Sequence, residues 1–236
     1  MKVYLSPSCQ TWNPYAYGNT NESAQCNRIA EYAREALIKN GYEVKKAVAN
    51  IPYSQAITES NAWKADLHIP IHTNAGGGKG TEVFAWSGSA SNKYVKAVYA
   101  EVSSVVPTAG RGIKTSPVWD EVAMTNAVCV YIECEFHDNA TTAKWIVDNS
   151  KVLGEAIARG ICNADGKVYK SLDVPPATPT APTPIPATPI KPLYRVRTSW
   201  AATTSQIGAF ASLENARQAA AAANPYKVFN DQGKIV

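Results

Sequence analysis

A proline-rich stretch, DVPPATPTAPTPIPATPIKP, runs from Asp173 to Pro192 of this chain. Proline fixes φ and has no backbone N–H, so this stretch cannot form a helix or a central strand. We expect it to be extended and semi-rigid. Patterned apolar sequence resumes after it, so it is not a disordered tail. We therefore predict a large domain over residues 1–172, a linker over 173–193 and a small domain over 194–236.

In the large domain, apolar runs of strand length alternate with segments of helical periodicity. Strands are expected at 2–6, 42–48, 65–75, 81–86 and 127–136, and helices at 21–41, 54–63, 92–106 and 142–162. Asn21 is the expected N-cap of the first helix, and Gly41 is expected to end it. This alternation predicts an α/β fold with a largely parallel twisted sheet flanked by helices.

The small domain has strand patterns at 193–200, 205–210 and 226–229, with a helix expected from about Ser212, its N-cap, to Ala223. This pattern predicts a compact β-α-β (α+β) unit. A unit of 43 residues buries little surface, so self-association as a homodimer is a possible source of stability. Its five lysines and arginines outnumber its two acidic residues, so the basic character of the chain is concentrated here.

Charge and cysteine usage exclude some classes of protein. The net charge of +4 suits an anionic polymer, but it falls short of the basic surface of a nucleic-acid-binding protein. No stretch approaches the roughly 20 apolar residues that a membrane span needs, so neither nucleic acid nor membrane is an expected partner. The five cysteines are an odd number without C-x-x-C spacing, which indicates neither a disulfide framework nor a four-cysteine zinc site.

Two histidines occur in the strand pattern ADLHIPIHTNA. His72 lies near its C-terminal end, where open α/β sheets place ligand sites. A neutral imidazole there is a common zinc ligand, although a lone histidine is more often a hydrogen-bonded core residue. His68 is expected to be such a core residue, because it lies about 13 Å from His72 along an extended strand.

Two glutamates are candidates for chemistry. Glu22 opens the first helix, where it is either a ligand or a carboxylate that stabilises the helix dipole. Glu133 lies near the end of the apolar run AVCVYIECEF, and burying an ionisable group there is costly unless the group is paired or used. Glu135 shares its face of the strand and is the competing candidate.

Residues 2–165 resemble the zinc-dependent N-acetylmuramoyl-L-alanine amidases of the amidase_3 type. The resemblance rests on five ordered motifs: NES at the first helix, ADLHIPIHTNA, GTEVF, RGIK from Arg111 to Lys114, and AVCVYIECEF. It implies that Glu22 and His72 bind zinc and that Glu133 is the catalytic carboxylate. It also implies hydrolysis of the bond between the muramic acid lactyl group and L-alanine in peptidoglycan. Asn74 and the GGGKG loop are expected, from position alone, to line the substrate groove.

The first strand departs from the pattern of this family. The family has D-P-G-H-G there, with a histidine ligand, whereas this chain has SPSCQ over residues 6–10. Strict register puts Cys9 in that place, and a thiolate is an excellent zinc donor. An S-P-S-x-Q opening resembles a subgroup in which the glutamine defines the pattern, so Gln10 is the preferred third ligand. Binding by neither residue, and a role for His137, stay open.

The small domain resembles the sporulation-related-repeat type of wall-binding module found on clostridial and phage amidases. This resemblance implies binding to anionic wall polymers or glycan through the aromatics of a tethered basic module, unless those aromatics form its core. The aromatic side chains concerned are Tyr194, Trp200, Phe210 and Tyr226.

Three functions remain in competition at this point. The preferred one is a peptidoglycan amidase, either a phage endolysin or a bacterial autolysin. The first residues, MKVYLSPSCQTWNPY, do not read as a secretory signal, so we expect synthesis in the cytoplasm and action at the wall after release. The others are a non-catalytic wall-binding protein that has lost zinc and a metallopeptidase acting on the stem peptide.

Overall fold

The structure is a computed structural model that describes residues 1–116, 118–172, 194–202, 205, 208–210, 213–221, 225–230 and 232–236. The chain divides into two compact units, Met1–Pro176 and Ala177–Val236. The predicted linker over 173–193 lies outside the described residues. Among the residues described, no helix is both long and apolar enough to cross a membrane.

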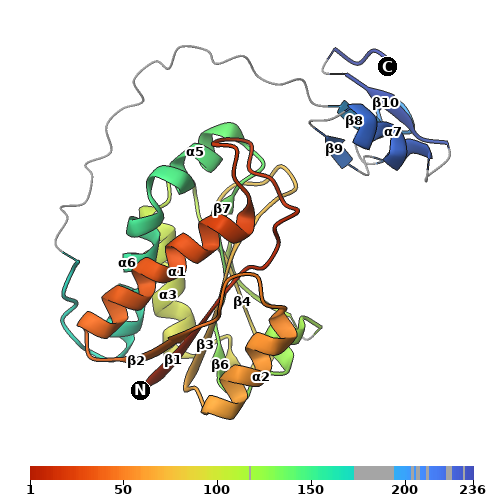
Figure 1. Ribbon diagram of the computed structural model, residues 1–236. Helices are drawn as coiled ribbons and strands as arrows, with labels where there is room; N and C mark the ends of the chain where they lie inside the picture. The colour runs from red at the N-terminus through yellow and green to blue at the C-terminus, as the bar shows by residue number, and fades with distance from the viewer. Residues whose placement is uncertain are drawn as a thin grey trace. The chain divides into compact units, whose positions relative to one another are not determined.

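The first unit contains a mostly parallel sheet flanked by helices, as predicted (Figure 1). Its elements in chain order are β1 (Lys2–Pro7), α1 (Glu22–Lys39), β2 (Glu43–Lys46), α2 (Tyr53–Trp63), β3 (Leu67–Asn74), β4 (Glu82–Ala85), a 3-10 turn η1 (Ser87–Ser89), α3 (Lys93–Val105), β5 (Gly112–Thr115), α4 (Asp120–Ala123), β6 (Val128–Cys129), β7 (Tyr131–Phe136), α5 (Ala140–Asp148) and α6 (Ser150–Ala164).

The strand order is β2-β1-β3-β7-β4-β5, and β6 also pairs with β3. All pairings in this sheet are parallel except that of β4 with β7. Parallel pairs need a crossover connection, and the helices between the strands supply it. The carboxyl ends of β1, β3 and β7 therefore meet at one edge of the sheet.

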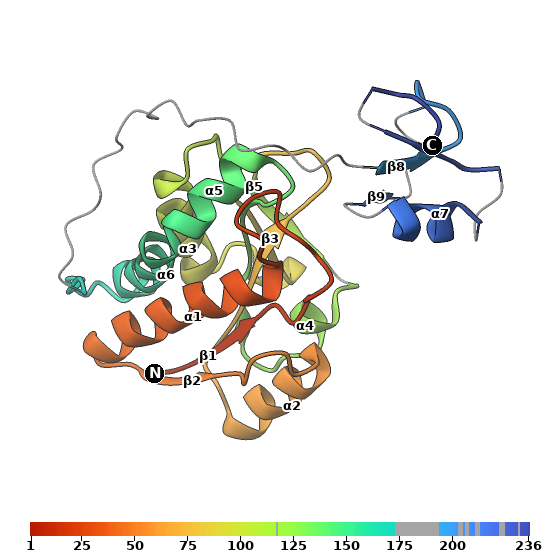
Figure 2. The same ribbon diagram turned by 45° about the horizontal axis from the view of Figure 1, so that its top comes forward.

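The two faces of the sheet have different partners. Alternate strand residues point to opposite faces, so Val3 and Leu5 of β1 lie in the main core, whereas Tyr4 lies in a smaller cluster with Ala47 and Ala56. Helices α1, α3, α5 and α6 cover the main core face, and α2 and α4, which contact each other, lie at the other face (Figures 1 and 2). His68 and His72 of β3 share the face of Tyr4.

Local signals predicted the first helix well. The Asn21 side chain accepts a hydrogen bond from Ala24 N at 2.9 Å, which is the expected N-cap interaction. At the other end, Gly41 adopts φ +80°, the left-handed conformation that glycine tolerates after a helix. The helix buries Cys26, Ile29 and the other apolar residues that share its inner face.

Two predicted elements are divided in the structure. The single helix expected over 142–162 is two helices, α5 and α6, because Asn149 leaves helical geometry at φ −118° and ψ 23°. The strand expected over 127–136 is interrupted at Val130, which separates β6 from β7. The short α4 and β5 were not expected as elements at all.

The second unit is a three-stranded antiparallel sheet with one helix. Its elements are β8 (Tyr194–Arg197), β9 (Gly208–Phe210), α7 (Leu213–Ala221) and β10 (Lys227–Phe229), in the sheet order β10-β8-β9. Val196, Ala216 and Val228 form its core, against which Tyr194 and Tyr226 pack. Those two aromatics are thus partly core residues, whereas Trp200 is 37% exposed. The Phe210 side chain and the predicted cap Ser212 lie outside the described part.

Candidate active site

The candidate site lies where β3 and β7 run side by side in the middle of the sheet. His72 and Glu133 are register partners on these neighbouring strands. Both are buried, with exposed fractions of 6% and 8%. Because the pairing is parallel, both residues lie toward the same carboxyl edge, which is where open α/β sheets bind ligands.

Glu22 reaches His72 from the start of α1. Its Oε1 lies 2.9 Å from His72 Nδ1, and its Oε2 accepts a hydrogen bond from Asn13 Nδ2 at 2.8 Å. Burial raises the pKa of Glu22, but the contact with His72 and the hydrogen bonds from Asn13 and Ser8 outweigh it and lower that pKa. Glu22 is therefore a buried carboxylate held ionised beside an imidazole.

Gln10 joins the same group of contacts through Asn13. The Asn13 Nδ2 that donates to Glu22 also donates to Gln10 Oε1, at 2.5 Å. The predicted ligands Gln10, Glu22 and His72 thus belong to one chain of contacts, in which Asn13 joins Gln10 to Glu22. Cys9, the alternative to Gln10, also lies in this loop and is partly exposed.

Glu133 and Glu135 differ sharply in their partners. Glu133 Oε2 is buried and has no hydrogen-bond partner among the described residues. Burial raises the pKa of Glu133 to about 8, with the charges of Glu22 and Glu82 adding to it and that of His72 opposing it. Glu135 instead accepts hydrogen bonds from Gly80 N, Phe136 N and the Thr108 hydroxyl. Glu135 is therefore committed to holding loops in place.

Sequence reasoning missed Glu121, which belongs to the four-residue helix α4. Its Oε1 accepts a hydrogen bond from Ser6 Oγ at 2.6 Å and lies 3.3 Å from His68 Nε2. Its other oxygen, Oε2, lies 3.7 Å from His72 Nε2. Burial raises the pKa of Glu121, but the contacts with both histidines outweigh it and bring that pKa to about 2. No local motif marks this residue, because its partners lie 115 and 53 positions away.

Two carboxylates therefore flank the ring of His72. Burial lowers the pKa of His72, but its contacts with Glu121 and Glu22 and the charge of Glu133 raise it to about 10. The ring also stacks on Tyr131, with centroids 4.6 Å apart and planes inclined by 19°. The ring plane is thus fixed by stacking and Nδ1 by its hydrogen bond with Glu22, while Nε2 faces Glu121 at the longer distance of 3.7 Å.

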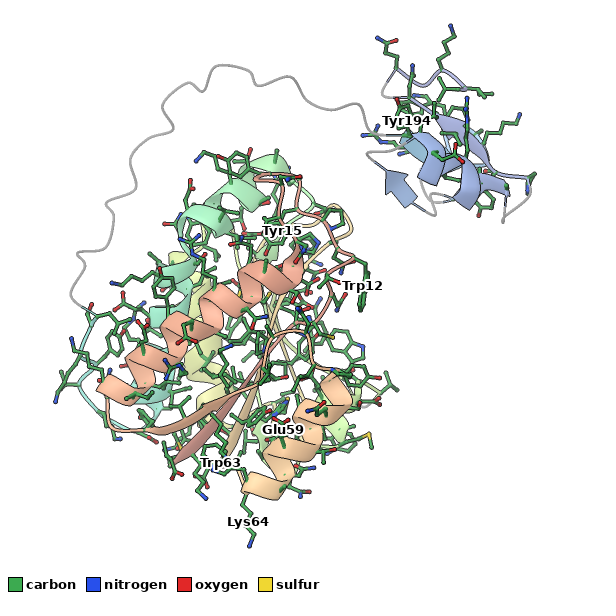
Figure 3. The ribbon with its side chains drawn as sticks, viewed as in Figure 1. Trp12, Tyr15, Glu59, Trp63, Lys64 and Tyr194 are labelled. Atoms are coloured by element: carbon green, nitrogen blue, oxygen red, sulfur yellow. The ribbon has the colours of Figure 1, made fainter. Side chains whose placement is uncertain are left out.

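A cleft of about 710 Å³ opens beside His72. Its wall is formed by Ser6, Pro7, Ser8, Cys9, Gln10, Thr11, Trp12, Ala47, Asn50, Ile51, Pro52, Tyr53, Ala56, His72, Val118, Trp119, Asp120, Glu121 and Tyr131. Trp12 is 69% exposed and projects from the loop after β1 (Figure 3). Of the described residues in this wall, none is lysine or arginine, so the cleft suits a ligand part that is neutral or positively charged.

Several other residues that the sequence singled out have structural partners. His137 Nδ1 contacts Thr73 Oγ1 at 2.9 Å, and its ring stacks on Tyr15, so it lies in a separate cluster from the candidate ligands. Asn74 donates a hydrogen bond to Glu82, and Arg111 and Lys114 form salt bridges with the same carboxylate. The motifs IHTNA, GTEVF and RGIK therefore meet at Glu82.

The GGGKG loop is held by Asp138. Its Oδ2 accepts hydrogen bonds from Gly76 N at 2.8 Å and Gly77 N at 2.7 Å. Neither this loop nor Asn74 belongs to the wall of the cleft. The expectation that they line the groove therefore does not hold for this cleft.

The donor set at His72 is compatible with zinc. Imidazole nitrogen and carboxylate oxygen are usual zinc donors, and His72 Nδ1 and Glu22 Oε1 already face each other at 2.9 Å. The unpaired Glu133 Oε2 is a buried acceptor that requires a donor. Within the part of the chain that the structure describes, no three His, Cys, Asp or Glu side chains form a group able to hold a metal ion. The described residues therefore bring together two zinc-type donors, His72 and Glu22, with Gln10 and Cys9 in the loop after β1.

Comparisons with known sequences give a consistent result. Residues 3–163 match the Amidase_3 family, described as N-acetylmuramoyl-L-alanine amidase. The chain is 27% identical over 173 residues to the sporulation-specific N-acetylmuramoyl-L-alanine amidase of Bacillus subtilis (strain 168), a match that covers 69% of this chain and 66% of that protein. It is 26% identical over 179 residues to N-acetylmuramoyl-L-alanine amidase CwlM of Bacillus licheniformis, covering 72% and 69% of the two chains. The chain thus spans about two thirds of the length of these curated relatives.

Solved structures share the fold of the first unit. The catalytic domain of CwlV, an N-acetylmuramoyl-L-alanine amidase from Bacillus (Paenibacillus) polymyxa var. colistinus, superposes with a TM-score of 0.64 at 19% identity, covering 70% of this chain and 98% of that one. The catalytic domain of the CD27L endolysin, which targets Clostridia difficile, gives a TM-score of 0.59 at 21% identity, covering 69% and 97%. At these identities the likeness shows the fold.

Proposed function

Because this chain belongs to the Amidase_3 family of N-acetylmuramoyl-L-alanine amidases, we propose that it hydrolyses the amide bond between N-acetylmuramic acid and L-alanine in peptidoglycan, with zinc as cofactor. The observation that carries the proposal is the chain of contacts Gln10–Asn13–Glu22–His72, which ends beside the unpaired carboxylate of Glu133. Hydrolysis of an unactivated amide needs an electrophilic centre and a proton carrier in one place, and this arrangement can provide both.

We assign zinc to Gln10, Glu22 and His72. Bound there, zinc supplies Lewis-acid chemistry, polarising a carbonyl and activating water. Gln10 is preferred to Cys9 because its amide oxygen shares the Asn13 donor with Glu22. The amide is a weaker donor than the imidazole of the usual family pattern, so we expect the two remaining ligands to dominate the affinity.

Glu133 is the proposed general base and acid. Its Oε2 is free to accept a proton from water and to donate it to the nitrogen of the leaving L-alanine amine. A pKa raised by burial to about 8 keeps both protonation states accessible near neutral pH. Glu135 is not suited to this role, because both its oxygens are already hydrogen-bonded.

The cleft beside His72 is the proposed substrate groove. Trp12, Tyr53 and Trp119 offer aromatic surface to the apolar faces of sugar rings or to the methyl groups of the lactyl and alanine moieties. The absence of lysine and arginine from its described wall suits a neutral stretch of the substrate. The proposed place of action is accordingly the cell wall, whether in an endolysin or in an autolysin.

The second unit is proposed to hold the enzyme on this insoluble substrate. Trp200 is partly exposed, and the guanidinium carbons of Arg195 and Arg197 lie 5.9 Å and 5.1 Å from its ring centroid. A basic aromatic surface of this kind suits anionic wall polymers or glycan. Tethering would raise the effective concentration of the catalytic unit at the wall.

Product analysis tests the proposed reaction. We expect purified peptidoglycan treated with the protein to gain new L-alanine amino termini, detectable by amine labelling and mass spectrometry. A chelator should stop their release, and added zinc should restore it. New termini within the stem peptide would instead identify a peptidase, and wall binding without any new termini would identify a non-catalytic wall-binding protein.

Replacing Trp12 by alanine tests the groove. Loss of one aromatic contact of the order of 1 kcal/mol should raise KM for soluble wall fragments about fivefold and leave kcat unchanged. Trp86→Ala is the matched control, because Trp86 is 43% exposed and lies outside the wall of the cleft. An equal change in KM for both variants would show that the substrate does not use this groove.

A further inference from the structure

A second polar cluster lies behind His72, on the side away from Glu22. It consists of Ser6 on β1, His68 on β3 and Glu121 on α4, and all three side chains are buried. His68 and His72 share one face of β3 because they are four residues apart. The cluster thus belongs to the same face as the candidate active site, and Ser6 and Glu121 border the cleft, but the reaction proposed above gives none of the three a chemical role.

The contacts of Glu121 fix the direction of its carboxylate. Ser6 Oγ and His68 Nε2 both approach Oε1, at 2.6 Å and 3.3 Å. His68 Nδ1 is buried and has no partner among the described residues. A proton on that nitrogen would be unsatisfied, so His68 carries its proton on Nε2 and donates it to Glu121. Oε1 is therefore occupied by two donors, and Oε2 is left to face His72.

The two nitrogens of His72 meet different carboxylates. Nδ1 lies 2.9 Å from Glu22 Oε1, and Nε2 lies 3.7 Å from Glu121 Oε2. Stacking on Tyr131 fixes the plane of the ring. Rotating the ring by half a turn would set its carbon atoms against both carboxylates. The observed orientation therefore assigns Nδ1 to the zinc side and Nε2 to the side of Glu121.

We propose that Glu121 is a positioning residue that holds the proton of His72 on Nε2, so that Nδ1 is the nitrogen free to bind the metal. The inference rests on the proposed function, because zinc itself belongs to that proposal. A carboxylate behind a metal-binding histidine fixes the tautomer and increases the basicity of the ligand. Ser6 and His68 in turn fix the carboxylate. Glu121 belongs to none of the sequence motifs, and the proposal gives it the role of orienting His72.

The variant Glu121→Gln gives a sharp test. Since Ser6 and His68 both donate at the position of Oε1, the glutamine carbonyl must take that place, and its amide nitrogen then faces His72. The glutamine N–H and a proton on His72 Nε2 would then be two donors facing each other. His72 must therefore carry its proton on Nδ1, which is the wrong tautomer for binding the metal through that nitrogen. We expect zinc affinity, measured by competition with a chromophoric chelator, to fall 10- to 100-fold.

Nitrogen-15 NMR of the His72 ring gives a second readout that does not depend on activity. In the zinc-loaded wild type we expect a protonated Nε2, and in metal-free Glu121→Gln a protonated Nδ1 with a bare Nε2. Circular dichroism of both proteins shows whether the variant is folded. A folded variant with wild-type zinc affinity and a protonated Nε2 would overturn the inference.

Glu59→Gln is the matched control. Glu59 lies on α2 (Figure 3) and accepts a hydrogen bond from Tyr4 OH at 2.6 Å, and the Tyr4 ring stacks on His68. Glu59→Gln removes a carboxylate that supports the same face of the sheet through Tyr4, without touching His72, so zinc affinity should stay unchanged. An equal loss of zinc affinity in this control would mean that general loosening of this face of the sheet is responsible, and the inference would fail.

X-ray absorption of the zinc-loaded proteins separates two roles of Glu121. The same number of oxygen and nitrogen ligands in wild type and Glu121→Gln supports a positioning residue. One ligand fewer in the variant would make Glu121 a direct ligand and overturn the inference. If the wild type itself bound no zinc, the result would differ from both of these outcomes. It would contradict the proposed zinc-dependent function and, with it, the role of Glu121.

Discussion

Replacing Glu133 by glutamine should lower kcat for release of L-alanine termini by about 10³-fold, the usual contribution of a general acid and base. The variant cannot accept the proton from water, but its shape and its place on β7 are unchanged. Zinc content should stay that of the wild type, because Glu133 is not among the proposed ligands. Turnover on soluble wall fragments and zinc content by atomic absorption are the measurements.

The same substitution should stabilise the metal-free protein. Burial raises the pKa of Glu133 from 4.5 to about 8, so the carboxyl disfavours folding once the unfolded chain can ionise. This destabilisation is absent at pH values below the pKa of Glu133 in the unfolded chain. It grows as the pH rises and reaches its full size above about pH 8. At pH 7 it amounts to about 3 kcal/mol, which glutamine avoids. Denaturant unfolding with chelator present should show this gain at pH 7 and none at pH 4.

Glu135→Gln is the matched control for both effects. Glu135 lies two residues along the same strand, and it accepts hydrogen bonds from Gly80 N, Phe136 N and the Thr108 hydroxyl. Its replacement should destabilise the protein and leave the rate of the chemical step largely intact. The opposite pattern, with turnover lost in Glu135→Gln and retained in Glu133→Gln, would transfer the catalytic role to Glu135.

Zinc content should fall in Gln10→Ala and not in Cys9→Ser. Outer contacts of a metal site are worth 10- to 100-fold in affinity, so the loss of Gln10, a weak direct ligand, should cost at least about 10-fold and less than the loss of His72. His72→Ala should abolish binding, because it removes the imidazole that Glu22 faces at 2.9 Å. Chelator competition followed by atomic absorption measures all three variants on one scale.

The Cys9→Ser variant is the decisive comparison. Serine keeps the size of the side chain but removes the thiolate, which is the better zinc donor. If Cys9→Ser loses zinc and Gln10→Ala keeps it, the ligand assignment is wrong and the thiolate replaces the missing histidine. If both keep zinc, neither residue binds it, and Glu22 and His72 hold the ion with water or substrate.

Much of the fold could be predicted because its signals are local. Asn21 and Gly41 delimit a helix by their own backbone chemistry, and the apolar runs at β3 and β7 mark buried parallel strands. The errors also have local causes. Asn149 ends one helix and begins the next within a periodic apolar pattern, so the period alone did not reveal the break. The four-residue α4 is too short to give a periodic signal.

The α/β class and the family could be read from the sequence, because each depends on patterns that are contiguous along the chain. The sequence also identified Glu22, His72 and Glu133 as candidates, through motifs with fixed spacing. How these three residues contact one another became visible only in the folded chain. Glu133 differs from Glu135 solely in which loops reach it, and Glu121 contacts His72 only because the sheet brings α4 beside β3. Such contacts join residues that are far apart in sequence, and no local pattern records them.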